Sequence, residues 1–224
     1  MIYAFGDSFT YGYNFKEKDR ENCTWPYFFS NQLNLPYTNM SAPGGSNWRI
    51  ARQIHNLHIQ EKDIIIIGWT EPSRFEFGVN QKYKQPLIKN GRIGDLIEDH
   101  KEYKVKRFFN QLSERTNDPN AKLFNDLAYT VYYDEKWFEE MFKIMFSSCL
   151  YILKNKKCNW IMFNTWIKQF SSKDVLFDVP QYIFNTSDMN FKIKNEHNLN
   201  YWNVEEHKKV ASVLFDFYKT LYLQ

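Results

Sequence analysis

The stretch Met1-Ile-Tyr-Ala-Phe-Gly-Asp-Ser-Phe-Thr-Tyr-Gly12 opens the chain and carries the strongest local signal in it. Its first part, Met1 to Phe5, is an apolar run that ends at Gly6, a pattern typical of a short buried strand. Gly6 and Gly12 both allow tight backbone turns around the residues between them. Ser8 therefore follows a strand directly, and open α/β sheets bind their ligands at that end of their strands.

Strands and helices alternate in the sequence that follows this stretch. Further strands are predicted at 35–40 and 63–69, and helices capped by Thr24 and Ser46 precede each of them. The unbroken apolar run Ile64 to Ile67 indicates a strand that is buried on both faces, as in a parallel sheet. The resulting β-α-β-α-β order predicts a parallel sheet covered by helices, with few allowed topologies.

The remainder of the chain is less regular. Residues 71–120 are polar with scattered aromatics, and we expect an elaboration that packs over or beside the site. A long amphipathic helix is predicted over 134–155 and a fourth buried strand over 159–166. Residues 168–202 have the pattern of a loop, and a last helix begins near Asn203, which can form a capping box with the glutamate three residues later.

Composition favours one folded domain. The chain has 224 residues, of which 43% are apolar and 19% aromatic, enough for a sizeable core. We expect a single domain over 1–224, built as a three-layer α/β/α sandwich with a central, mostly parallel sheet. The formal net charge of +3 is close to balance, so no nucleic-acid partner is expected. Richness in Lys, Asn, Tyr and Phe is typical of AT-rich genomes, including viral ones.

The cysteine pattern excludes several other classes. Cys23, Cys149 and Cys158 are odd in number and widely spaced, which is typical of free thiols in a reducing compartment. No zinc-type cluster is present, so no metal or cofactor is predicted. The chain opens with a strand rather than a signal peptide, and its longest aliphatic run is too short to span a bilayer. These features predict a cytoplasmic protein without a membrane partner; they leave the oligomeric state open.

The heptapeptide from Gly6 to Gly12 resembles the first motif block of the SGNH, or GDSL-type, hydrolases, which are serine esterases and lipases with relatives that act on acetylated sugars. The resemblance implies that Ser8 is the nucleophile and that its backbone N–H helps to hold the oxyanion. A second block, Asn39-Met-Ser-Ala-Pro-Gly44, also matches. In the family its closing glycine offers a backbone N–H to the oxyanion, and that role falls on Gly44.

The third block departs from the family pattern of Gly-x-Asn-Asp. The aligned stretch is Gly68-Trp-Thr-Glu71, so Thr70 stands where the family has an oxyanion-binding asparagine. A threonine hydroxyl donates one hydrogen bond, with a shorter reach than an amide. Arg74 is a candidate to compensate as a cation near the developing charge, although a solvated loop position is the simpler interpretation.

The last block departs further. The family has Asp-x-x-His before its final helix, and here the aligned residues are Asn198 and Tyr201, neither of which can serve as the acid or the base. His197 in the preceding loop is the first candidate for the base, and His207 in the helix is the second. Each also has a structural interpretation, as a surface residue and as a helix-packing residue. The acid partner is open among Asp188, Glu196 and Glu205.

Two functions from different classes follow. The first is a serine esterase or deacetylase acting on an acylated small molecule or glycan, without a cofactor. The second is an SGNH-fold protein that binds a ligand or partner without catalysis, favoured by the missing Asp and His pair. An acyltransferase with the same nucleophile is a weaker third.

Overall fold

The computed structural model describes residues 1–72, 74–78, 103–107, 134–165, 182–185 and 202–223. Its centre is a parallel sheet with strand order β2-β1-β3-β6-β7. The strands are β1 (Ile2–Phe5), β2 (Tyr37–Asn39), β3 (Ile64–Trp69), β6 (Asn159–Asn164) and β7 (Tyr182–Asn185). The α/β class and the parallel sheet predicted from the sequence are confirmed.

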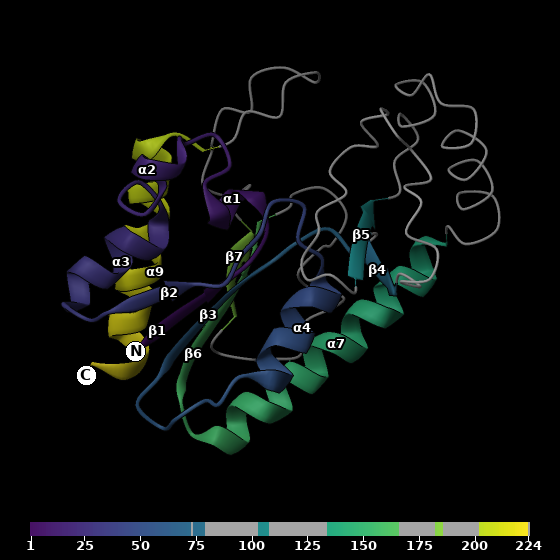
Figure 1. The fold of residues 1–224 in the computed structure, drawn as a ribbon. Helices are drawn as coiled ribbons and strands as arrows, with labels where there is room; N and C mark the ends of the chain where they lie inside the picture. Colours follow the sequence, from purple (N-terminus) through teal and green to yellow (C-terminus); the bar gives the residue numbers. More distant parts are fainter. Residues whose placement is uncertain (73, 79–102, 108–133, 166–181, 186–201, 224) are drawn as a thin grey trace.

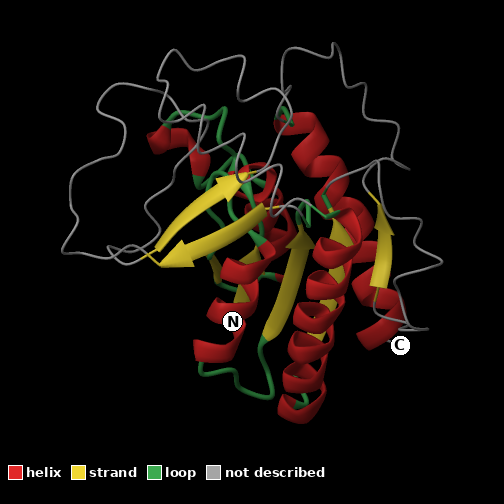
Figure 2. Ribbon diagram, turned by 90° about the vertical axis from the view of Figure 1, so that its right-hand side faces the viewer, coloured by secondary structure: helices red, strands yellow, loops and turns green. Residues whose placement is uncertain are grey.

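Helices cover the two faces of this sheet (Figures 1 and 2). On one face lie α3 (Trp25–Leu33) and α9 (Val204–Tyr222), which pack against each other. On the other face lie α4 (Asn47–Asn56) and α7 (Glu135–Lys156), which form a second pair. The arrangement is therefore the three-layer sandwich that the sequence predicted.

The isoleucine run of β3 explains why both faces must be covered. Ile65 and Ile67 belong to the core under α4 and α7, whereas Ile64 and Ile66 belong to the core under α3 and α9. Alternation of side chains along a strand sends successive residues to opposite faces. Each fully buried isoleucine contributes on the order of 1.5–3 kcal/mol relative to an exposed one, so β3 anchors both layers.

Several local expectations need correction. The segment predicted as a loop contains β7, a four-residue strand that pairs with β6. Such a short apolar run carries too little periodicity to distinguish a strand from a loop. The single-turn helices α1 (Ser8–Tyr11) and α2 (Glu17–Arg20) were also not predicted. The capping box at Asn203 and Glu206, in contrast, is confirmed.

A small hairpin stands apart from the central sheet. β4 (Arg74–Gly78) and β5 (Tyr103–Arg107) pair antiparallel with each other, and β4 packs against α4. Both strands fall in the segment 71–120 for which no regular structure was predicted. Figure 1 shows the hairpin on the side of the sheet where α4 and α7 lie, away from α3 and α9. The remaining residues of that segment are not among those that the structure describes.

Candidate active site

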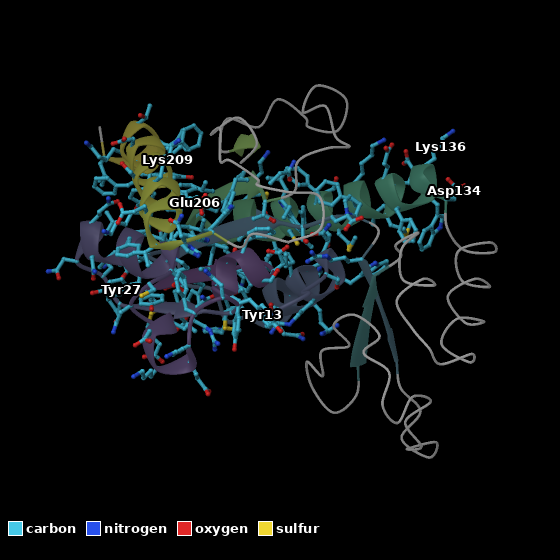
Figure 3. All side chains as sticks on the ribbon, turned by 90° about the horizontal axis from the view of Figure 1, so that it is seen from above. Tyr13, Tyr27, Asp134, Lys136, Glu206 and Lys209 are labelled. Carbon is cyan, nitrogen blue, oxygen red and sulfur yellow. The ribbon has the colours of Figure 1, made fainter. Side chains whose placement is uncertain are left out.

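Three segments from the first half of the chain meet at one edge of the sheet. Ser8 follows the end of β1, Gly44 follows β2, and Thr70 comes directly after β3. Because these strands are parallel and adjacent, their carboxyl ends lie together. This is the upper end of the sheet in Figure 1, where α1 lies. Figure 3 looks down on the molecule and labels Tyr13, just after α1, and Glu206, in the first turn of α9.

Ser8 is the first residue of α1. Asp7 is the N-cap of this turn, and its Oδ1 accepts a hydrogen bond from the Phe9 N–H at 3.0 Å. The turn ends at Gly12, whose φ of 73° is left-handed and whose N–H returns to the Ser8 carbonyl at 3.0 Å. The N–H of Ser8 therefore lies in the first turn of a helix, where backbone donors have no intrahelical acceptor.

The turn after β2 packs directly against the turn that carries Ser8. A Cβ added to Gly45 would lie 3.0 Å from the Gly6 carbonyl oxygen, so a side chain here would require the two turns to separate by a few tenths of an ångström. Gly44 has a φ of 64°, another left-handed conformation that favours glycine. Within the described residues, no acceptor meets the N–H of Ser8 or of Gly44. Two backbone donors are thus left available on adjoining turns.

The second motif block is also tied to α1 through a side chain. The Asn39 Nδ2 donates to the Thr10 carbonyl at 3.0 Å, and its Oδ1 accepts from the N–H of Ser41 at 3.2 Å. One amide therefore connects the carboxyl end of β2 to the end of the turn that carries Ser8. This explains in physical terms why an asparagine at this position suits the block, which the sequence matched only by resemblance.

Thr70 occupies the expected position but makes a different contact. Its Oγ1 donates to the Asp7 Oδ2 at 2.8 Å, and a hydroxyl has a single hydrogen to give. In this arrangement Thr70 supports the Asp7 carboxylate rather than an oxyanion. Its backbone is held by Asn47, which accepts from the Thr70 N–H at 2.9 Å and donates to the Thr70 carbonyl at 2.8 Å.

Arg74 likewise faces Asp7 and not solvent. Its Nη1 lies 2.9 Å from the Asp7 Oδ2 and also donates to the Gly45 carbonyl at 3.1 Å. Arg74 is 1% exposed and Asp7 is fully buried. The interpretation of Arg74 as a solvated loop charge is therefore wrong. Sequence reasoning did not identify Asp7 as its partner because the two residues are 67 positions apart and nothing local links them.

The exposure of Ser8 differs from what its motif led us to expect. We expected the side chain in a surface crevice, but Ser8 is 6% exposed. Gly6 and Asp7 are the two residues before Ser8. The turn at Gly45 packs against them and contributes to the burial of Ser8. Its position on the edge shared with Thr70 agrees with the prediction; its accessibility does not.

His207 has a structural role in the observed fold. It is fully buried, and its Nδ1 accepts a hydrogen bond from the Trp25 N–H at 3.0 Å, at the start of α3. The rings of Phe15 and Trp202 face it at 5.4 and 5.5 Å between centroids. Burial lowers the pKa of His207 to about 3. A ring whose acceptor nitrogen is already used, and which resists protonation, is unsuited to take the Ser8 proton.

This contact also revises the start of α3. Thr24 is at the N-cap position, as predicted, but its side chain makes no capping hydrogen bond. The imidazole of His207 supplies the acceptor for the first helical N–H instead. The helix-packing interpretation of His207 is therefore the one that the geometry favours.

The other members of the last block lie mostly outside the described residues. This applies to His197, Asn198, Tyr201, Asp188 and Glu196. Glu205 is described: it is exposed on α9 and paired with Lys208 at 2.7 Å. The segment reaches the described part of the chain again at Trp202, which packs against Phe9 at 5.1 Å between ring centroids and accepts from the Asn14 amide at 3.0 Å.

Other kinds of site find little support in the described part of the chain. There, no group of three or more His, Cys, Asp and Glu side chains is placed to hold a metal ion. The three cysteines are free, and burial raises the pKa of Cys149 to about 12 and that of Cys158 to about 11, which makes these two thiols poor nucleophiles. None of the described helices combines the length and apolar character that a bilayer crossing requires.

Comparison with known proteins shows similarity at the level of the fold. No protein-family model and no curated protein matches the sequence. Among solved structures, one similar protein is assigned to the G-D-S-L family of lipolytic proteins of Desulfitobacterium hafniense DCB-2. The two are 10% identical with a TM-score of 0.49, over 96% of this chain and 98% of that one.

A second similar structure is that of a carbohydrate esterase whose active site displays divergent catalytic and non-catalytic binding functions. It is 11% identical with a TM-score of 0.50, and the match covers 99% of this chain but 65% of that one, less than two thirds of its length. The similarity to the carbohydrate esterase structure is therefore one of fold, and it extends over nearly the whole of this chain.

Proposed function

We propose that this chain, whose fold is similar to that of a carbohydrate esterase, is a serine hydrolase that cleaves carboxylic esters through Ser8. The observation that carries the proposal is the pairing of two turns at the carboxyl edge of the sheet. One turn carries Ser8 and the other carries Gly44, and no described acceptor uses the backbone N–H of either residue. Preorganised donors of this kind stabilise an oxyanion without reorganising during the reaction.

The reaction would proceed by acyl transfer. The Ser8 Oγ attacks the ester carbonyl carbon while a general base takes its proton, and the carbonyl oxygen becomes an oxyanion held by the two N–H groups. The C–O bond to the leaving alcohol then breaks, and the base returns the proton to that alcohol. Water attacks the acyl-serine in the same way, releasing the acid and restoring Ser8. No cofactor enters these steps.

His197 is the proposed base. It stands five residues before Trp202, which packs against the residue that follows Ser8. Five residues of extended chain span at most about 17 Å, so the sequence separation from Trp202 permits His197 to come to the Ser8 region. His207 is a weaker candidate because its Nδ1 is used by α3. The choice of Asp188, Glu196 or Glu205 as the acid remains a prediction.

A small acylated molecule or glycan is the proposed substrate, and the chain is proposed to act in the cytoplasm without a membrane or nucleic-acid partner. The test is turnover of p-nitrophenyl acetate together with covalent labelling by a fluorophosphonate, followed by intact-mass spectrometry. Ser8→Ala should abolish both signals. His197→Ala should reduce turnover by about 10² to 10⁴, whereas His55→Ala, on α4, should leave it unchanged.

A second function is favoured by two observations on the same site. Ser8 is 6% exposed, and the described histidine of the last block is used structurally. Both suit a protein that binds an acylated ligand without cleaving it. If wild type shows neither turnover nor labelling above Ser8→Ala, this binding function replaces the esterase.

A further inference from the structure

We propose that Arg74 is a positioning residue. It holds the turn that carries Ser8 (the nucleophile turn) in register with the turn that carries Gly44 (the oxyanion turn). The inference rests on the proposed function of Ser8 and Gly44. It starts from one nitrogen: the Arg74 Nη1 lies 2.9 Å from the Asp7 Oδ2 and 3.1 Å from the Gly45 carbonyl oxygen. Asp7 directly precedes the nucleophile, and Gly45 directly follows the second oxyanion donor.

The first contact, between Arg74 and the Asp7 carboxylate, fixes the orientation of the nucleophile turn. The Asp7 carboxylate accepts from the Phe9 N–H, the Thr70 hydroxyl and Arg74, so three groups fix its orientation. Through its N-cap contact, the same carboxylate sets where α1 begins. Charge-assisted hydrogen bonds are short and strongly directional, so the guanidinium holds this carboxylate more firmly than the neutral donors do.

The second contact has no part in neutralising charge. A buried carboxylate needs a cation, and the Asp7 pair alone would meet that need. The bond from Arg74 to the Gly45 carbonyl instead connects the turn after β2 to the turn after β1. The packing of Gly45 against Gly6 and Asp7 brings these turns close, and the guanidinium joins them by hydrogen bonds. A displacement of about 1 Å in such a site can cost about 10²-fold in rate.

Arg74 also connects the site to the hairpin. It is the first residue of β4 and is paired in register with Arg107 of β5. Its backbone N–H donates to the Glu71 carbonyl at 3.2 Å, which continues the turn that carries Thr70 out of β3. The positioning group thus comes from outside the central sheet, three residues after the third block, in which the chain lacks the family's asparagine.

The test must separate positioning from the stability of a buried ion pair. Removing Arg74 alone would leave the Asp7 charge buried without its cation, a change that destabilises proteins strongly. We therefore use Asp7→Asn/Arg74→Met, which removes both charges and keeps an N-cap side chain, since asparagine caps helices as well as aspartate does. Arg74→Lys keeps the positive charge, but its ammonium ends one bond short of the Nη1 position from which both contacts are made. Lys208→Met removes an exposed cation from α9 and serves as the matched control.

Three measurements are made on each protein: melting temperature, kcat and KM on p-nitrophenyl acetate, and hydrogen exchange of the segments 1–12 and 40–46. We expect the double variant and Arg74→Lys to stay folded, with kcat lowered about 30- to 100-fold and KM within about threefold of wild type. Exchange should rise about tenfold in both segments while α9 stays protected. Lys208→Met should match wild type throughout.

Either folded variant would overturn the inference if it kept wild-type kcat and wild-type exchange in both segments. If the double variant does not fold, Arg74→Lys decides by the same measurements. If wild type shows no Ser8-dependent turnover, the proposed function fails and exchange alone decides. Unchanged exchange in 1–12 and 40–46 would then overturn the positioning role, and faster exchange in both would support it.

Discussion

Lowering the pH from 7 to 5 is expected to weaken the folded state through His207. The ring is fully buried, and burial lowers its pKa to about 3, whereas in the unfolded chain a histidine has an ordinary pKa of about 6.5. Below about 6.5 the unfolded chain binds a proton that the folded chain refuses, so the free energy of unfolding decreases as pH falls towards about 3. At pH 5 the difference amounts to about 2 kcal/mol, from roughly 1.5 pH units at about 1.36 kcal/mol each.

The groups around the ring do not offset this effect. Among the described residues, the ring is in contact with the Trp25 N–H and with the rings of Phe15 and Trp202, none of which titrates between pH 5 and 7. Protonating His207 would also place a hydrogen on Nδ1, against the Trp25 N–H. Acid should therefore loosen the contact between α9 and the start of α3.

The assay is urea unfolding followed by tryptophan fluorescence at pH 7, 6 and 5, for wild type and for His207→Asn. Asparagine keeps an acceptor oxygen near the Nδ1 position but cannot be protonated in this range. The variant should lose about 2 kcal/mol less than wild type between pH 7 and pH 5. Parallel losses in the two proteins would refute the claim that the fold holds His207 neutral.

Three further outcomes are expected. Asn47→Ala removes both hydrogen bonds to the Thr70 backbone and leaves a buried N–H and C=O unpaired, so urea unfolding should show a loss of about 2–4 kcal/mol. Gly6→Ala would place a Cβ 2.2 Å from the Thr10 Oγ1, and calorimetry should show a loss of about 1–3 kcal/mol; an unchanged melting temperature would contradict the tight packing. Asn203→Ala breaks the capping box of α9 and should cost about 1 kcal/mol in urea unfolding, with an unchanged m-value.

Much of the architecture follows from short-range patterns in the sequence. The isoleucine run at Ile64–Ile67 predicts a strand buried on both faces, because no other placement hides four consecutive apolar side chains. The alternation of strands and helices in the first part of the chain then leaves a parallel sheet with Ser8, Gly44 and Thr70 at one edge. Periodicity, caps and glycines are properties of neighbouring residues, so they can be read before the fold is known.

The contacts inside the site could not be predicted in this way. Arg74 meets Asp7 because β1 and β3 are adjacent in the sheet, and His207 meets Trp25 because α9 packs on α3. Both pairs join residues far apart in the chain, and either side chain alone fits several surroundings equally well. The hairpin of β4 and β5 escaped notice for the same reason, since each strand is stabilised by a partner distant in sequence.

What the sequence by itself determined is therefore the fold class and the edge of the sheet at which the Ser8 segment lies. Both depend on local backbone preference and on the direction of strands. Only the tertiary structure decided that Thr70 supports Asp7, that Arg74 bridges two turns, and that His207 caps a helix. The physical reason is that a polar side chain takes its role from the groups that burial brings within hydrogen-bond distance, and those groups come from elsewhere in the chain.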